Sequence, residues 1–271
     1  MSSFKYIYII LFLIMGCDEG PQFDNPLDPD NNPDYVAPET NIITDIDGMT
    51  FDTSYVQVVI SGNELVSQYS YTLDSLLWSD WSADDTLKLN YLDEGEYTLH
   101  VKSRYLSGEE DSEPVSASFI IDAVQGPGLR IFPIYSEFDA GESESVQLYL
   151  ESVENISFGE IVLNLKSNAS CNSNILASKG SLLTTNNGET VLISEEFEEN
   201  ISGDVFASYK ITFGISQDGG IGLSGTGSVA NLQFSDCGHP IEIEFDLENS
   251  KILDYGNSEI PLIDSGVGII E

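Results

Sequence analysis

The sequence predicts an all-β chain of two consecutive β-sandwiches, preceded by a signal peptide and a disordered acidic tether. Apolar residues alternate with polar ones along many short segments, which is the period of half-buried strands. No segment after residue 16 carries a persuasive helical period. A Gly- and Pro-containing break at residues 123–128 divides the strand-rich part in two. These observations favour two β-modules in series.

Residues 1–16 are predicted to be a secretory signal. Lys5 leads an apolar run that is shorter than the roughly 20 residues of a membrane-spanning helix. The segment Leu13–Cys17 (LIMGC) resembles the lipobox of bacterial lipoproteins. That resemblance implies cleavage before Cys17 and diacylation of its sulfur, which would anchor the mature chain to a membrane by lipid. The alternative is an ordinary signal peptide followed by a chance cysteine.

Residues 17–37 are predicted to form an acidic, Pro-rich tether. Prolines and charge repulsion extend such a segment, which has no hydrophobic period. A calcium-loop frame can be placed here, but Pro33 stands where the sharp turn needs glycine. The interpretation is a solvated stalk, and loose calcium binding is the alternative for the frame of Asp28, Asp30, Asn32, Asp34 and Glu39.

The charge of the chain disfavours whole classes of partner. The formal net charge is -37, with 46 Asp and Glu against 9 Lys and Arg. Such an acidic surface repels nucleic-acid phosphates and anionic lipids, so we expect no nucleic-acid binding and membrane contact only through the lipid. The 13 Tyr, 13 Phe and 2 Trp supply core material and argue against disorder of the whole chain.

Residues 38–122 form the first predicted sandwich. About 85 residues hold several short strands separated by turn signals, which is typical of a small β-sandwich. The inward sets are Val56, Val58 and Ile60; Tyr69, Tyr71 and Leu73; Leu87, Leu89 and Tyr91; Tyr97, Leu99 and Val101; and Val115, Ala117, Phe119 and Ile121.

The run Leu92–Val101 (LDEGEYTLHV) resembles the late part of a fibronectin type III or related immunoglobulin-like module. In such folds a tyrosine near the start of the late strand hydrogen-bonds back to the backbone and ties a corner. Tyr97 occupies that position. The resemblance implies an immunoglobulin-like sandwich and carries little information about function.

Trp78 and Trp81 lie in the run Trp78–Ser82 (WSDWS), which matches the WSxWS pattern of cytokine receptors. In those receptors the pattern lies late in its module, whereas here it precedes Tyr97, so the match is interpreted as coincidence. Two tryptophans near a loop can form a sugar-stacking platform, because a flat ring offers apolar area at little rotamer cost. The favoured interpretation is that at least one packs in the sandwich core.

Residues 123–271 form the second predicted sandwich, which is long enough for two sheets and a core of its own. The segment Ile241–Glu248 alternates apolar residues with acids, so one face should be buried and the other acidic. The other inward sets are Val146, Leu148 and Leu150; Ile161, Leu163 and Leu165; Ala207, Tyr209, Ile211 and Phe213; and Ala230, Leu232 and Phe234.

Three strings in this module resemble a cohesin domain in order and spacing: Gly180–Leu183 (GSLL), Gly225–Phe234 (GTGSVANLQF) and Leu253–Pro261 (LDYGNSEIP). The resemblance implies a flattened jelly-roll sandwich, a fold that cohesins share with a group of carbohydrate-binding modules. It also implies dockerin-type protein partners. The sequence departs from the family at Lys166–Cys171, where an aromatic-Asp-Pro turn is usual.

The cysteines predict one disulfide. With Cys17 taken by lipid, Cys171 and Cys237 remain as an even pair in an exported chain, where oxidation is permitted. A metal site would need more ligands than His239, which alone stands near them. We therefore expect a disulfide and no metal site or cofactor.

The chain lacks the parts of an enzyme. His100 and His239 are the only histidines and belong to different predicted modules. The pairs Glu195-Glu196 and Glu198-Glu199 lie in a run predicted to be a solvated loop, where two carboxyls are not held across a cleft. The sequence therefore favours a binding function over catalysis.

The resulting hypothesis is a lipid-anchored protein of the bacterial cell envelope, at the outer membrane or cell surface rather than the inner membrane. Its cohesin-like module would bind a polysaccharide or another surface or secreted protein. The alternative is a structural spacer with no ligand of its own. Aromatics that could stack on a ligand are Trp78, Trp81, Tyr135, Phe138, Tyr149 and Tyr255.

Overall fold

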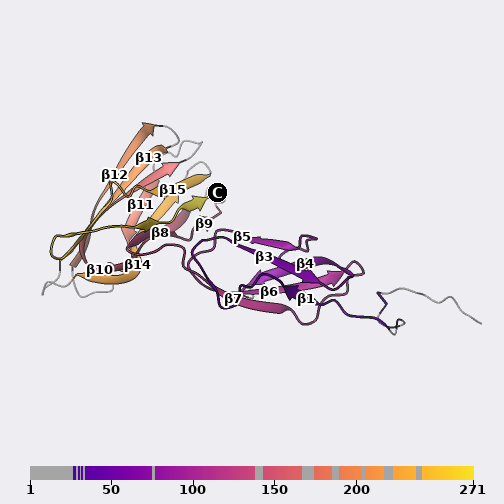
Figure 1. Cartoon of the computed structure of the whole chain (residues 1–271). Helices are drawn as coiled ribbons and strands as arrows, with labels where there is room; N and C mark the ends of the chain where they lie inside the picture. The colour runs from indigo at the N-terminus through magenta and orange to yellow at the C-terminus, as the bar shows by residue number, and fades with distance from the viewer. Residues whose placement is uncertain are drawn as a thin grey trace, which may run out of the picture.

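The computed structural model describes residues 27, 28, 30, 32, 34–74, 77–137, 143–166, 174–184, 189–202, 205–216, 222–235 and 240–271. These residues form strands and connecting loops, with no α-helix among them, which confirms the all-β prediction. Two separate apolar cores are present, one built from residues 42–123 and one from residues 129–270. Figure 1 shows the two sandwiches arranged end to end.

The first module consists of two sheets. A three-stranded sheet has the order β1-β3-β5, and a four-stranded sheet has the order β2-β7-β6-β4. This arrangement is an immunoglobulin-like sandwich. The strands are β1 (Thr40–Ile42), β2 (Thr50–Phe51), β3 (Val56–Gly62), β4 (Val66–Leu73), β5 (Thr86–Leu89), β6 (Gly95–Tyr105) and β7 (Val115–Ile121).

Alternation places the apolar residues of these strands in one core, as the sequence predicted. In β3, Val56, Val58 and Ile60 are buried while their neighbours Gln57 and Val59 face outward. Tyr91 departs from the predicted pattern. It lies beyond the end of β5 with a φ of 55° and is 46% exposed, so the strand ends before it and its ring points away from the core.

Tyr97 makes the backbone bond expected of a tyrosine corner. Its hydroxyl donates to the carbonyl oxygen of Asp93 at 3.0 Å, and its ring stacks on Phe119 with a centroid distance of 5.6 Å. Burial, followed by the nearby Asp93 and Asp74 carboxylates, raises the pKa of Tyr97 to about 12. The hydroxyl therefore stays a donor at physiological pH and holds the turn before β6 in place.

The second module is a larger sandwich. Its central path of strands is β11-β14-β10-β15-β19-β9, with β12, β13, β16, β17, β8 and β18 branching from it. The strands are β8 (Gly128–Phe132), β9 (Tyr135–Ser136), β10 (Ser143–Lys166), β11 (Asn174–Lys179), β12 (Glu189–Ser202), β13 (Val205–Ser216), β14 (Leu223–Ser235), β15 (Ile241–Phe245), β16 (Lys251–Asp254), β17 (Glu259–Ile260), β18 (Asp264–Ser265) and β19 (Gly268–Ile270).

The 24-residue strand β10 belongs to both layers of this sandwich. Its first part pairs with β8 and β14, and its second part pairs with β13, β15 and β16. The two parts meet where Ser152 and Asn155 have φ values of 50° and 55° and the register with β14 shifts. Such bulges bend and twist a strand, so β10 can turn from one layer into the other.

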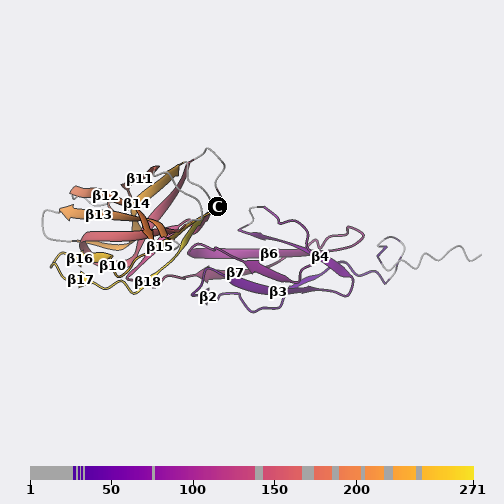
Figure 2. The same cartoon turned by 90° about the horizontal axis from the view of Figure 1, so that it is seen from above.

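The two modules touch at a joint between the turn before β6 and the start of the second module. Asp93 Oδ1 accepts the backbone N–H of Ile134 at 2.7 Å, and Glu94 Oε1 accepts that of Val124 at 2.6 Å. The rings of Tyr91 and Tyr135 stack with centroids 5.1 Å apart. The boundary segment, residues 123–128, is thus docked on the first module through Val124. Figure 2 shows from a second side that the two modules meet at their ends.

The N-terminal segment leaves the first module at the end remote from this joint (Figure 1). Tyr105 fixes its exit, because the Tyr105 hydroxyl donates to the carbonyl oxygen of Val36 at 2.7 Å. Tyr35 packs edge-on against the Tyr105 ring at 6.5 Å. The first module therefore stands between the N-terminal segment and the second module.

Candidate functional site

The second module has two outer sheet faces, and they differ in chemistry. The first lies on β8, the first part of β10, β14 and β11, and we call it the amide face. The strand register places its members opposite one another. They are Arg130, Phe132, Gln147, Tyr149, Leu176, Ser178, Asn231 and Gln233.

Aromatic and aliphatic side chains reach solvent on the amide face. Phe132 is 38% exposed and Leu176 is 62% exposed. The Phe132 ring meets the Tyr149 ring edge-on at 6.0 Å, and the Arg130 guanidinium lies 4.1 Å from the centre of the Tyr149 ring. Phe132 and Tyr149 thus form an apolar centre of the face on β8 and β10. Leu176 is a separate exposed apolar residue on β11.

Hydrogen bonds hold the polar side chains of the amide face in place. Tyr149 donates its hydroxyl to Gln147 Oε1 at 3.1 Å. Gln233 Nε2 donates to Ser143 Oγ at 2.9 Å, and Asn231 Nδ2 donates to the carbonyl oxygen of Lys179 at 3.0 Å. Side chains that are already ordered would lose less entropy if a ligand bound to this face.

The amide face is almost neutral, although the chain carries a net charge of -37. Its one cation, Arg130, is bound by Glu151, whose Oε2 lies 2.9 Å from Arg130 Nε. Glu94 of the first module approaches the same guanidinium at 3.8 Å. Protein interfaces are depleted in Asp, Glu and Lys and enriched in aromatic residues and Arg, and the amide face shares this composition.

The second outer face lies on β13, the second part of β10 and β15, and we call it the acid–lysine face. Lys166 Nζ lies 2.5 Å from Glu244 Oε1 and 3.8 Å from Glu242 Oε1. Lys210 lies 4.0 Å from Glu160. The Lys166 ammonium lowers the pKa of Glu244. The pKa of Glu242 is raised by the hydrogen bond between Glu242 and Glu244 and by burial. These solvated pairs confirm the predicted alternation of buried residues and acids along β15.

The predicted stacking aromatics of the second module do not share a face. Tyr135 is occupied in the joint, where it stacks on Tyr91 and its hydroxyl hydrogen-bonds Glu271 Oε2 at 3.2 Å. Tyr149 lies on the amide face under Arg130. Tyr255 follows β16 and is 40% exposed, and Phe138 lies outside the described residues. A coplanar row of Tyr135, Tyr149 and Tyr255 is therefore absent.

Trp78 and Trp81 are not in the core of the first module, contrary to the favoured sequence interpretation. They lie over the outward side chains of β6. Lys102 Nζ is 4.7 Å from the Trp78 ring and 5.1 Å from the Trp81 ring, and the Arg104 guanidinium is 4.3 Å from the Trp81 ring. Cation–π attraction explains this placement, because β6 presents two cations beside an edge that the Trp-bearing segment covers. The cations lie against ring surface on which a sugar could otherwise stack.

Several predicted residues lie outside the described part of the chain: Cys17, Cys171, Cys237 and His239. His100 faces outward from β6, opposite Thr72 and Ser116. Among the described residues, no group of three His, Cys, Asp or Glu side chains could hold a metal ion. In the same part of the chain, no helix is long and apolar enough to span a membrane.

The prediction of a solvated loop at the paired glutamates is wrong, because the backbone of this segment is a β-strand. Glu195, Glu196, Glu198 and Glu199 lie within β12, which pairs with β13. The register sets Glu196 opposite Lys210. This strand could not be recognised from the sequence, because acids fill most positions of the run and no alternation of apolar and polar residues is visible. The pairing of Glu196 with Lys210 becomes apparent only from the register of the two strands.

Comparisons with known proteins give similarity to cohesins only at the level of solved structures. No protein-family model matches the chain, and no curated protein matches it. A non-cellulosomal cohesin from Archaeoglobus fulgidus is 16% identical, with 53% of this chain and 88% of that chain covered and a TM-score of 0.34.

Two further cohesin structures were solved with dockerins. The sixth cohesin of scaffoldin B from Acetivibrio cellulolyticus, in complex with a mutant Cel5 dockerin, is 18% identical over 54% of this chain and 99% of that one, with a TM-score of 0.38. The OlpC cohesin complex from Clostridium thermocellum is 19% identical over 53% and 94%, with a TM-score of 0.33. At these identities and scores, the similarity identifies no partner for this chain.

Proposed function

We propose that this protein is a non-enzymatic, lipid-anchored binding protein of the bacterial cell envelope, and that its second module binds a partner protein through the amide face. The observation that carries the proposal is the composition of that face. It combines exposed Phe132 and Leu176 with fixed amides and one paired cation, on a chain with 46 acids. An acid-poor, ordered and partly apolar sheet face is suited to protein docking.

The arrangement of the modules supports presentation away from a membrane. The N-terminal segment leaves the first module at the end remote from the joint. With Cys17 lipidated, the acidic tether and the first module would hold the second module at a distance from the lipid. We place the protein at the outer membrane or cell surface, where a partner can reach it.

A dockerin-type partner is the finer form of this proposal, and it rests on the cohesin-like strings of the sequence. A polysaccharide is the second candidate, favoured by Gln147 and Gln233, whose amides can bond hydroxyl groups. The Arg130 guanidinium over the Tyr149 ring argues against stacking of a sugar there. A protein partner therefore accounts for more of the face than a glycan does.

The test uses the full mature chain on the surface of the bacterium that makes it. A photo-reactive residue in place of Phe132 should cross-link one partner protein, which mass spectrometry identifies. Phe132→Asp should then weaken binding of that purified partner at least tenfold, because it puts a charge in the apolar centre. The matched control is Asn164→Asp on the acid–lysine face, which should change affinity less than twofold.

Three outcomes would overturn the proposal. Loss of binding with Asn164→Asp but not with Phe132→Asp would move the partner to the other face. Retention of a glycan by the purified chain, abolished by Gln233→Ala, would favour the polysaccharide function. If neither proteins nor glycans are retained, the chain is a spacer.

A further inference from the structure

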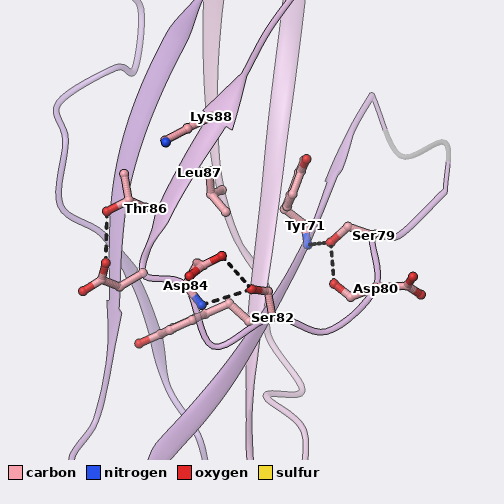
Figure 3. Close-up of a pocket in the computed structure, with 10 residues that line it drawn as sticks. Tyr71, Ser79, Asp80, Ser82, Asp84, Thr86, Leu87 and Lys88 are labelled. Carbon is pink, nitrogen blue, oxygen red and sulfur yellow. Dashed lines mark hydrogen bonds between the residues drawn. The ribbon is translucent and has the colours of Figure 1, made fainter.

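The first module contains an open groove that the proposed function does not use. It has a volume of about 610 Å³ and runs between β5 and the segment of residues 79–85 that follows β4 (Figure 3). Tyr71 and Leu87 contribute apolar surface to its lining, and Leu87 is only 7% exposed. The groove therefore lies over the edge of the sandwich core.

One wall of the groove is a segment that already covers the edge of β4. The N–H of Tyr69 donates to the carbonyl oxygen of Ser82 at 2.7 Å, and the N–H of Ser82 donates back at 2.9 Å. The N–H of Ser79 donates to the carbonyl oxygen of Tyr71 at 2.8 Å. Along Tyr69–Tyr71, this segment therefore covers the edge of the four-stranded sheet.

The opposite wall is the uncovered edge of β5. The three-stranded sheet ends at β5, which pairs only with β3 among the described residues. The N–H of Ile60 donates to the carbonyl oxygen of Asp85 at 2.8 Å, so Asp85 and, two residues on, Leu87 are in hydrogen-bonded pairs. The N–H and C=O groups of Thr86 and Lys88 consequently point away from β3, toward the groove.

The groove carries more acidic than basic side chains, which favours a positively charged ligand. Asp80, Asp84 and Asp85 line it, against the one amine of Lys88. Asp84 Oδ2 accepts the Ser82 hydroxyl at 3.1 Å, as Figure 3 shows. Asp85 Oδ1 accepts the Thr86 hydroxyl at 3.0 Å. A carboxylate has about four acceptor positions, so each can also bind a cation. A second copy of this acidic chain is disfavoured as the occupant.

We propose that this groove binds an extended, basic segment of a partner protein, which adds as a strand to β5. Its backbone would pair with the N–H and C=O groups of Thr86 and Lys88. Its Lys or Arg side chains would meet Asp80, Asp84 and Asp85. Strand addition takes its affinity from main-chain bonds and its specificity from alternate side chains, and the four residues of β5 suit a segment of about four to six residues.

The experiment titrates the full soluble chain, starting at Asp18, with an acetylated and amidated Lys-Thr-Lys-Thr-Lys-Thr peptide. Amide chemical shifts are followed by NMR, with Glu-Thr-Glu-Thr-Glu-Thr as the control peptide. The basic peptide should shift the amides of Thr86 and Lys88, and the acidic peptide should not. Equal shifts with both peptides, or shifts confined to other surfaces, would overturn the proposal.

Thr86→Pro separates strand addition from general charge attraction. It removes the N–H that faces the groove and breaks no bond to β3, so the module should fold and affinity should fall at least tenfold. The matched control, Thr86→Ala, should stay within twofold of the wild type.

Asp84→Asn with Asp85→Asn keeps the backbone edge and should weaken binding about threefold to tenfold. If Thr86→Pro fails to fold, this variant tests the charge of the groove, and the amide shifts of Thr86 and Lys88 test the strand addition. Unchanged affinity in the double variant would overturn the proposal, as would groove binding of a neutral oligosaccharide that Thr86→Pro leaves intact.

Discussion

The two modules are stabilised in different ways. The first is built from short strands and secured by side-chain ties, such as the bond from the Tyr97 hydroxyl to Asp93 and the tryptophans over Lys102 and Arg104. The second depends on one strand, β10, that runs through both of its layers and contributes eight of its buried core residues. Loss of one tie in the first module should therefore cost less than a disturbance of β10 and its neighbours in the second.

The largest expected effect concerns the predicted disulfide of the second module. The register of β11 with β14 ends at the pair Asn174 and Ser235, three residues after Cys171 and two before Cys237. Closing a loop of this length should stabilise the module by about 4 kcal/mol in the chain-entropy model. Urea unfolding of the chain starting at Asp18, with and without reductant, measures the loss on reduction.

Cys171→Ser with Cys237→Ser is the control for the disulfide. It should be destabilised by the same amount, and reductant should not change it further. Titration of two free thiols in the denatured, untreated protein would contradict the prediction.

The next effect is overpacking under β10. A Cβ added at Gly159 would overlap the Phe213 ring and lie 2.9 Å from Ile252 Cδ1. Gly159→Ala should therefore destabilise the second module by about 1–3 kcal/mol, measured by urea unfolding. Gly256→Ala is the matched control, because there the nearest atom is Asp254 Oδ1 at 3.2 Å, in an exposed turn. Phe213→Leu should recover part of the loss, and equal costs at Gly159 and Gly256 would refute the packing argument.

The strands with a strict period of two could be predicted from the sequence, and so could the hydrogen bond from the Tyr97 hydroxyl to the backbone. The features that could not be predicted depend on pairing between residues that are far apart in the chain. In the sequence pattern, Val146–Leu150 and Ile161–Leu165 are two separate inward sets, but both belong to β10. Between them Val153 and Ile156 are buried three residues apart, and this spacing at the bend interrupts the alternation.

The candidate surfaces were predicted less completely than the strands. Tyr149 was named, but Phe132, Leu176 and Gln233 were missed, because they join one face only through the pairing of β8, β10, β14 and β11. The joint was missed for the same reason. Tyr91 lies in a turn with a positive φ, and nothing in the sequence around it indicates that its ring stacks on Tyr135 of the second module.

Removing the tie at Tyr97 should have a smaller effect than either change in the second module. Tyr97→Phe keeps the stacked ring and loses one hydrogen bond to Asp93, so the free energy of unfolding of the first module should fall by about 1 kcal/mol in urea.

The raised pKa of Tyr97, about 12, adds a test at alkaline pH. Its stabilising contribution is present below the ordinary value near 10 and is lost as the pH rises toward 12. Tyr97→Phe should lack that alkaline loss, and an identical loss in both proteins would exclude Tyr97 as its source.

The smallest expected effect lies at the joint between the two modules. Burial raises the pKa of Asp93, against the opposing effects of the Ile134 N–H and Arg130; Glu94, Glu151 and Tyr97 lie on the adjoining surfaces. A raised carboxyl pKa means that the docked state favours the protonated form. That contribution is therefore present below about pH 4 and is lost as the pH rises through the folded pKa.

Asp93→Asn keeps an acceptor for the Ile134 N–H and removes the charge. It should be near neutral at pH 4 and stabilising by less than about 1 kcal/mol at pH 7, in urea unfolding at the two pH values. Glu96→Gln is the matched control, because it changes the net charge equally at an exposed position of β6. If both variants shift stability alike at both pH values, general repulsion among the acids of the chain accounts for the effect, and the joint carries none of it.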